Sequence, residues 1–268
     1  MPEVRVAVSG AAGRMGRAAI RAIAREGDMR LVAALGRQQH VGRDAGEVAG
    51  IGALALPITA DLSTVLGASP DVLVEFAPGA PAADHARAAL ERGVRPVVGS
   101  TGIPPADIES LRALAAQRRL GVVVAPNFAI GAVLMMEFAR IAARYMPHVE
   151  IIEQHHDRKR DAPSGTAVKT AQLIAEARGA APPPAVKEEE MLAGARGGLA
   201  EGVRVHSVRL PGLGAHQEVI LGGPGQTLVI RHNSHTEESF MPGLLLAVRR
   251  VGTLDGLAYG LEHLLGLR

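Results

Sequence analysis

Residues 4–16 read VRVAVSGAAGRMG, and this stretch decides the fold expected for the first half of the chain. Residues 4–8 form a short apolar run typical of a buried strand, and glycines follow it at once. Residues 17–25 have helical composition, and residues 30–35 predict a second strand. A strand, a glycine loop, a helix and another strand in this order form the first unit of a dinucleotide-binding fold.

The glycine spacing has a physical reason. A dinucleotide pyrophosphate must approach the backbone closely at a helix N-terminus, where free N–H groups and the helix dipole offset its charge. Gly10 permits the tight turn, Gly13 leaves room for the phosphates, and Gly16 lets the helix pack on the strand. The spacing is G-x-x-G-x-x-G rather than the commoner G-x-G-x-x-G, so a merely structural turn is the alternative.

The residues after the second predicted strand bear on the choice of cofactor. An acid there would hydrogen-bond the ribose 2′-hydroxyl of NAD and repel the 2′-phosphate of NADP. The chain has Gly36 and Arg37 instead, and a guanidinium suits a phosphate. We therefore expect Arg37 to contact the cofactor and NADPH to be preferred to NADH. The alternative is that Arg37 is a solvated loop residue.

The rest of the chain predicts an α/β protein with two domains. Further strands at residues 71–76, 96–98 and 121–125 alternate with helices at 81–91 and 104–118, which implies a parallel sheet covered on both faces. After residue 127 the pattern changes, and the expected elements are a helix at 131–145, a strand at 148–155, a helix at 166–177, an exposed loop over 180–184 and 187–198, antiparallel strands at 203–210, 216–221 and 226–232, and helices at 242–251 and 257–264. We expect a Rossmann-type dinucleotide-binding domain of residues 1–127 and 240–268, with an inserted α+β substrate and oligomerisation domain of residues 128–239.

Composition excludes several other functions. Aromatic residues make up 2% of the 268 residues, and Trp is absent, which argues against base-stacking platforms for nucleic acid. The net charge is +2 without a Lys/Arg block, so we expect no nucleic-acid partner. No apolar stretch reaches the ~18 residues of a membrane span, and the N-terminus lacks the layout of a signal peptide. The chain has no Cys, which fits a reducing cytoplasm, where we expect the protein to reside.

The most informative stretch for chemistry is residues 153–166, EQHHDRKRDAPSGT. It contains adjacent imidazoles, an ammonium group and carboxylates, and it leads into Ser-Gly-Thr, which predicts a helix start. Lysine occurs only at 159, 169 and 187, so 29 − 3 = 26 of the basic residues are Arg. A Lys at this place suggests a need for an ammonium that can give up its proton, which Arg cannot do.

Three interpretations of this stretch compete. It can be a solvated turn after a strand. It can hold a metal through His155, His156 and Asp157, but neighbouring strand residues point to opposite faces and Lys159 would repel a cation, so we expect no metal. It can bind an anionic substrate, with the amides at the helix start and the Thr166 hydroxyl holding a carboxylate while Lys159 and a His donate protons. We favour the third interpretation.

The run from residue 153 to 167 resembles the signature of the 4-hydroxy-tetrahydrodipicolinate reductase family, traditionally called dihydrodipicolinate reductases. The glycine loop, GSTG at 99–102 and APNF at 125–128 follow in the family's order. So do PGL at 211–213, HQE at 216–218 and GGPGQ at 222–226. The resemblance covers nearly the whole chain, and the central motif is highly specific.

This resemblance implies an activity and a set of roles. It implies reduction of 4-hydroxy-tetrahydrodipicolinate to tetrahydrodipicolinate by NAD(P)H in the diaminopimelate route to lysine. His155 would be the acid/base residue and Lys159 the proton donor, while His156, Gly165 and Thr166 would bind the substrate dicarboxylate. The implied cofactor residues are Gly10, Ala11, Ala12, Gly13, Arg14, Met15, Gly99, Ser100, Thr101, Ala125, Pro126, Asn127 and Phe128. The resemblance also implies a homotetramer built by the sheet of the inserted domain, and a hinge between the domains.

The chain departs from the family pattern at a few positions. Glu75-Phe76-Ala77 replaces the more usual Asp-Phe-Thr or Asp-Phe-Ser, and Ser100 stands where Thr is common. The family usually has an acid at or near Gly36, which bears on the use of NADH. Two alternatives are weighed against this family. Another NAD(P)-dependent amino-acid dehydrogenase, of homoserine- or aspartate-dehydrogenase type, would share the glycine loop but lack the His-His-x-x-Lys motif with Ser-Gly-Thr. A non-catalytic NAD(P)-sensing module would need an added DNA-binding or interaction segment. The sequence leaves open the cofactor ratio and the step at which water leaves the substrate.

Overall fold

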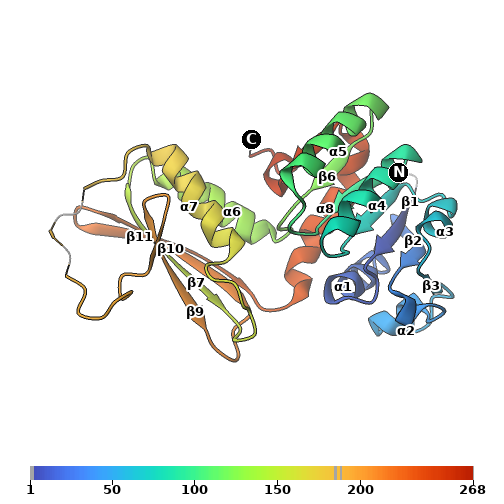
Figure 1. Ribbon diagram of the computed structural model, residues 1–268, viewed down its shortest axis with the longest axis horizontal. Helices are drawn as coiled ribbons and strands as arrows, with labels where there is room; N and C mark the ends of the chain where they lie inside the picture. Colours follow the sequence, from blue (N-terminus) through green and yellow to red (C-terminus); the bar gives the residue numbers. More distant parts are fainter. Residues whose placement is uncertain (1–2, 184–185, 188, 268) are drawn as a thin grey trace. The chain divides into compact units, whose positions relative to one another are not determined.

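The computed structural model describes residues 3–183, 186–187 and 189–267, which form two compact units (Figure 1). Unit 1 combines Met1–Ile130 with Glu237–Arg268, and unit 2 is Gly131–Thr236. The sequence-based domain boundaries, at 127/128 and 239/240, lie three residues from these unit boundaries at 130/131 and 236/237. Among the described residues, every helix falls short of the length and apolar character that crossing a bilayer demands.

Unit 1 is built on a seven-stranded sheet whose paired neighbours all run parallel. The strand order is β12-β6-β5-β4-β1-β2-β3, so the chain moves outward in one direction from β1 and then in the other from β4. The strands are β1 (Val4–Ser9), β2 (Met29–Leu35), β3 (Ile58–Thr59), β4 (Val72–Glu75), β5 (Arg95–Val98), β6 (Val122–Val124) and β12 (Leu257–Tyr259). The order reverses between β1 and β4, and doubly wound folds bind ligands outside the carboxyl ends of the strands at such a reversal.

Helices cover this sheet and bury its strands. They are α1 (Arg14–Ile23), α2 (Ala45–Ala49), α3 (Leu62–Gly67), α4 (Ala80–Glu91), α5 (Pro105–Arg118) and α8 (Met241–Arg250), with short 3-10 turns η1 (Gln38–His40), η2 (Glu237–Phe240), η3 (Val251–Thr253) and η4 (Leu261–His263). The central residues of β1 are fully buried, as expected for a strand covered on both faces. The carboxylates of Asp44 and Asp61 accept backbone N–H groups and thereby start α2 and α3. The α/β fold class predicted from the sequence is confirmed.

One expected helix in unit 1 is wrong. Residues 257–264 do not form a helix: Leu257–Tyr259 is the edge strand β12, and η4 follows it. Leu257, Ala258 and Tyr259 pair in register with Val122–Val124 of β6. A short apolar run is compatible with either type of element, and here pairing with a sheet edge far back in the sequence decides the outcome.

Unit 2 is a five-stranded mixed sheet with two main helices (Figure 1). Its strand order is β11-β10-β7-β9-β8, and the elements are α6 (Ile130–Ala142), β7 (His148–His155), α7 (Gly165–Arg178), β8 (Gly198–Ala200), β9 (Val203–Arg209), β10 (Ala215–Gly223) and β11 (Gln226–Ser234). Helix α7 packs against β7, β8 and β9 and buries residues such as Ala171, Leu173 and Ile174.

The three strands expected to be antiparallel, β9, β10 and β11, do alternate in direction, but β7 lies between β9 and β10 in the sheet. β10 and β11 form an antiparallel hairpin, and β10 also pairs antiparallel with β7. β9, however, lies on the other side of β7 and runs parallel to it. A parallel pair needs a long crossover, and α7 provides one between β7 and β9. This pairing brings Arg209 beside His155.

Candidate functional site

The first candidate site lies at the glycine loop of unit 1. Gly10 has a φ of +73°, and a Cβ atom there would lie 3.0 Å from the backbone carbonyl of Phe76. A Cβ on Gly16 would lie 2.2 Å from the Gly10 carbonyl oxygen, and one on Gly13 would lie 3.1 Å from the same atom. The loop therefore needs glycine for both conformation and space, as a close-packed turn at a strand end requires.

The start of α1 is open to an anion. Its N-cap, Gly13, lacks a side chain, and the first turn carries no acidic residue, so no described side chain caps these amides. Ala11 is buried and donates its N–H to the Leu35 carbonyl, while Arg14 is exposed, with its guanidinium 3.4 Å from Glu237. Ala12 and Met15 are half-buried. Uncapped amides at a helix N-terminus fit a phosphate group.

Two further predicted segments lie at the ends of β5 and β6. A Cβ atom on Gly99 would come within 2.3 Å of the Phe76 ring and 2.8 Å of the Phe128 ring. These rings meet edge to face with centroids 6.4 Å apart. The Ser100 hydroxyl donates to the Ala77 carbonyl at 2.6 Å, which ties the loop after β5 to the loop after β4.

The remaining predicted cofactor residues flank this cluster. The amide of Ala125 donates to Val98, and the Asn127 side chain accepts the amide of Ala129 at 2.8 Å. Thr101 and Pro126 are exposed. Unit 1 thus brings the glycine loop and the segments 99–101 and 125–128 to the carboxyl ends of its central strands, where a dinucleotide fits.

Glu75 also lies in this region, although the sequence marked it only as a departure from the family pattern. The side chain is fully buried at the end of β4, accepts hydrogen bonds from the Ser9 hydroxyl at 3.0 Å and the Ala77 amide, and contacts His85 Nδ1 at 2.8 Å. It therefore links the end of β1, the loop after β4 and α4. An acidic residue inside an otherwise apolar strand was the only signal in the sequence.

Arg37 lies where β2 ends, and it is exposed. A side chain at the preceding Gly36 would place its Cβ 2.6 Å from the Ile58 methyl group Cγ2. The packing of β2 on β3 therefore favours glycine at this position, and a carboxylate there would have to displace Ile58. Arg37 follows β2, whereas the segments 99–101 and 125–128 follow β5 and β6 of the same sheet.

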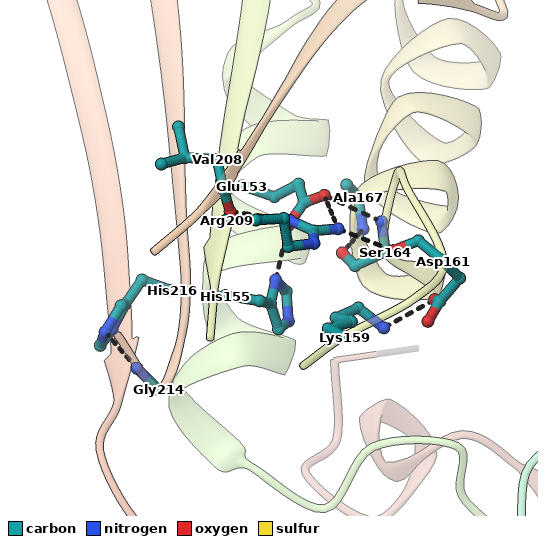
Figure 2. Close-up of polar contacts among 10 residues, drawn as sticks. All are labelled: Glu153, His155, Lys159, Asp161, Ser164, Ala167, Val208, Arg209, Gly214 and His216. Carbon is teal, nitrogen blue, oxygen red and sulfur yellow. Dashed lines mark hydrogen bonds and ion pairs between the residues drawn. The ribbon is translucent and has the colours of Figure 1, made fainter. Parts of the chain in front are cut away.

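The second candidate site lies in unit 2, where β7 ends and α7 begins (Figure 2). His155 is the last residue of β7, and Gly165 is the first of α7. Ser164 caps the helix through its hydroxyl, which accepts the Ala167 amide at 3.2 Å. Between them, the Lys159 amide donates to the His156 carbonyl and closes a tight turn. The sequence predicted both the strand end and the helix start, which set the length of this turn.

Buried polar contacts organise the end of β7. Glu153 is fully buried, and its carboxylate contacts His155 Nδ1 at 2.5 Å and receives two hydrogen bonds from the Arg209 guanidinium, at 2.8 and 2.9 Å (Figure 2). Burial alone would raise the pKa of Glu153, but the hydrogen bonds from His155 and Arg209 outweigh it and lower the pKa to about 2. Glu153 is therefore ionised at neutral pH.

Lys159 projects from the turn toward Asp161 (Figure 2). Its ammonium group lies 2.6 Å from the Asp161 carboxylate, and four-fifths of its side chain is shielded from solvent. This hydrogen bond is the main cause that lowers the pKa of Asp161. The contact places the Lys159 ammonium group at the same end of β7 as His155, where it can offset negative charge.

The predicted substrate residues lie just after β7 and in the first turn of α7. His156 is half-buried, and its Nδ1 atom is buried with no hydrogen-bond partner among the described residues. Gly165 is exposed and has open space around it, while Thr166 is half-buried in the first turn. A polar anionic ligand would give a partner to the His156 ring nitrogen, which has none among the described residues, and it would suit the helix N-terminus at Gly165.

Arg209 and His216 belong to this region but were not predicted as site residues. Arg209 pairs in register with His155 across β7 and β9, and His216 lies on β10 next to β7. His216 is buried, and burial, helped by nearby His235, lowers its pKa, so its ring is neutral. No spacing pattern could have revealed them, since strand pairing brings them to the site.

Fold and sites together define a class: an NAD(P)H-dependent oxidoreductase with a doubly wound nucleotide unit and an inserted sheet unit. The family descriptions "Dihydrodipicolinate reductase, N-terminus" and "Dihydrodipicolinate reductase, C-terminus" match residues 4–128 and 131–265. The 4-hydroxy-tetrahydrodipicolinate reductase of Moorella thermoacetica is 52% identical over 265 residues, covering 98% of each chain. That of a Cyanothece species is 50% identical over 267 residues, covering 97% of each.

A solved structure agrees with these relatives. It is a dipicolinate-bound dihydrodipicolinate reductase from a Paenisporosarcina species, 43% identical, with a TM-score of 0.87 over 97% of this chain and 99% of the other. The chain belongs to the dihydrodipicolinate reductase family. The resemblance inferred from the sequence motifs is therefore confirmed, and it replaces the two alternatives, an amino-acid dehydrogenase of another type and a non-catalytic sensor.

Proposed function

We propose that this chain reduces 4-hydroxy-tetrahydrodipicolinate to tetrahydrodipicolinate with NAD(P)H, the reductase activity for which its relatives are named. The observation that carries the proposal is the turn between β7 and α7, which holds His155 and Lys159 between the end of the strand and the start of the helix in a chain of this family. The solved relative bound to dipicolinate, a ring with two carboxylates, supports a substrate of the same kind.

Unit 1 would hold the cofactor. Gly10–Met15 would bind the pyrophosphate through the uncapped amides of α1, and the segments 99–101 and 125–128 would line the nicotinamide. When bound, NAD(P)H supplies the hydride. The tight packing of Phe76 and Phe128 over Gly99 would fix the shape of the nicotinamide side before the cofactor arrives.

Unit 2 would hold the substrate and handle the proton. The amides of Gly165 and Thr166 would donate hydrogen bonds to one carboxylate of the substrate, and His156 would contact the dicarboxylate through its Nδ1 atom, which has no partner among the described residues. Negative charge grows on the ring as it accepts hydride. The Lys159 ammonium would offset that charge and release a proton from Nζ, with His155 as the acid/base partner.

Arg37 would give the enzyme a preference for NADPH. Its exposed guanidinium follows β2, where the adenosine ribose binds in this type of fold, and a guanidinium suits the 2′-phosphate. A side chain at Gly36 would have to displace the Ile58 methyl group, so the packing disfavours a carboxylate there that would favour NADH.

We also propose a cytoplasmic homotetramer. The β11 strand lies at an edge of the unit 2 sheet and exposes Leu228 and Val229 by 40% and 50%, respectively. An exposed apolar edge strand is prone to pair with another chain. Light scattering coupled to gel filtration tests this proposal. A mass near four times the chain's 27.8 kDa is expected, and a monomer would contradict it.

The assay that tests the activity supplies the condensation product of aspartate semialdehyde and pyruvate, with NADPH or NADH, and follows the loss of reduced-cofactor absorbance. Oxidation that depends on the condensation product is expected, with a higher kcat/KM for NADPH. Oxidation of neither cofactor would defeat the proposed activity. Reduction of NADP⁺ by homoserine or aspartate, measured in parallel, would favour the amino-acid dehydrogenase alternative.

A further inference from the structure

The buried carboxylate of Glu153 contacts three parts of the unit 2 site at once. One oxygen, Oε2, lies 2.5 Å from Nδ1 of His155. The other oxygen, Oε1, lies 3.3 Å from the backbone amide of Ser164, the residue that caps α7. Arg209 binds both oxygens. Glu153 thus joins the end of β7, the start of α7 and the end of β9 (Figure 2).

The alternation of a β-strand explains the contact with His155. Residues two apart on a strand point to the same face, so Glu153 and His155 lie side by side on β7. An ionised carboxylate can only accept hydrogen bonds. Nδ1 of His155 must therefore carry the hydrogen of this contact, which leaves Nε2 as the ring nitrogen that can exchange a proton with a ligand.

Arg209 serves two purposes here. Its guanidinium grips Glu153 at two points and also donates to the Asp161 carbonyl at 2.7 Å, which fixes the turn that carries Lys159. Its positive charge also balances the carboxylate. Without it, a buried negative charge beside the site would repel a substrate with two carboxylates.

We propose that Glu153 is the positioning residue of this site: it holds His155 in the Nδ1–H tautomer, with Nε2 facing the ligand, and ties the acid/base group to the start of α7. This inference rests on the proposed function for the role of His155. Glu153 does not touch the substrate, so it acts through His155 and Ser164. The arrangement parallels the general rule that a buried carboxylate sets the tautomer of a working histidine.

A second cluster on the same strand offers a matched control. Glu150 of β7 binds the Arg196 guanidinium and lies 2.8 Å from Nε2 of His206, so it has the same types of partner as Glu153. Being three residues away, it lies on the other face of the strand and outside the turn. Removing the Glu150 carboxylate therefore shows the general effect of breaking a Glu–Arg–His cluster, and any further effect of removing the Glu153 carboxylate belongs to Glu153 itself.

The kinetic test compares Glu153→Gln, Glu153→Asp and Glu150→Gln in the reductase assay, with thermal unfolding recorded for each. Asp keeps the charge and stays within reach of the long Arg209 side chain, but its carboxylate is withdrawn from His155. We expect both Glu153 variants to lose about tenfold or more in kcat while the cofactor KM stays within about twofold, and Glu150→Gln to keep its kcat. A Glu153→Asp enzyme with wild-type kcat would reduce Glu153 to a structural partner of Arg209 and overturn the proposal.

A spectroscopic test is independent of turnover. Long-range proton–nitrogen spectra of protein with ¹⁵N-labelled histidine, assigned with His155→Gln, report which ring nitrogen carries the hydrogen. We expect the Nδ1–H tautomer for neutral His155 in the wild type, and the Nε2–H tautomer in Glu153→Asp. An Nε2–H tautomer in the wild type would sink the proposal even if the enzyme were active. If the wild type failed to reduce the substrate, the proposed function would fall while this measurement still decided the tautomer.

Discussion

The candidate anion sites of the two units are built differently. In unit 1 the candidate site is made of backbone: Gly13 is the N-cap of α1 and provides no side-chain cap, and Gly10 and Gly16 lack the Cβ atoms that the tight turn could not hold. In unit 2 the site is made of charged side chains held by one another, with Lys159 against Asp161 and Glu153 against Arg209. Substitutions of the loop glycines in unit 1 should therefore act through steric contact, and substitutions of the charged residues in unit 2 should act through charge.

The largest expected effect concerns charge in unit 2. Lys159→Met keeps the length and apolar stem of the side chain but removes the ammonium, so we expect kcat to fall by about 10²–10⁴-fold, the range for loss of a positioned proton donor. Lys169→Met, at an exposed position on α7, is the matched control and should keep wild-type kcat. Steady-state kinetics and thermal unfolding measure both. Near-normal turnover by Lys159→Met would show that the reaction does not need the Lys159 ammonium group.

Acid should weaken unit 2 through Glu153. Its pKa is about 2 in the folded chain against 4.5 for an ordinary Glu, so the folded state binds fewer protons. The ionised carboxylate therefore contributes about 3 kcal/mol to the free energy of unfolding. This contribution is fully present above pH 4.5 and is lost as the pH falls toward 2. Denaturant unfolding across this range should show a smaller pH dependence in Glu153→Gln than in Glu176→Gln, an exposed residue of α7. Equal slopes would contradict the prediction.

Steric contact should dominate in unit 1. Gly16→Ala places a methyl group 2.2 Å from the Gly10 carbonyl oxygen, which must shift the loop. We expect a loss of about 2 kcal/mol in stability and a raised cofactor KM, with substrate KM unchanged. Gly67→Ala is the control, because a Cβ atom there meets nothing within 4 Å. Unchanged cofactor binding in Gly16→Ala would break the steric account of this loop.

The cofactor preference tests the proposed role of the Arg37 guanidinium in unit 1. Arg37→Gln should lower kcat/KM for NADPH by about tenfold and leave that for NADH nearly unchanged, because only NADPH has the 2′-phosphate. Arg25→Gln, also exposed in unit 1, should change neither value. A parallel fall for both cofactors would mean that Arg37 does not read the phosphate.

The smallest effect should come from a glycine in unit 2. A Cβ atom on Gly165 would meet nothing within 4 Å, and the residue does not have a positive φ, so Gly165→Ala should fold normally. Any rise in substrate KM, which we expect to be about threefold, would then report close approach of the substrate carboxylate to the helix start. Substrate titrations at saturating NADPH measure it, with the cofactor KM as the internal reference. No change in substrate KM would place the carboxylate elsewhere.

Local pattern accounts for most of what could be predicted. The glycine loop, the alternation of strands and helices and the charged turn are all readable over a few residues, because each depends on the backbone needs of its own segment. The helix expected at β12 was wrong because its three residues become a strand only by pairing with β6. The pairing of β9 with β7 was not predicted, because the sequences of β9 and β10 do not indicate which edge of β7 each strand joins.

The sequence by itself determined the doubly wound unit, the family and the chemical groups available in the turn from His155 to Thr166, since these follow from periodicity and motif. Only the tertiary structure decided which groups hold one another. Arg209 lies 56 positions from Glu153, and Glu75 and Ser9 are 66 apart, yet each pair shares a hydrogen bond. Strand register brings such partners together, and register is set by the burial of whole strand faces rather than by any short stretch of chain.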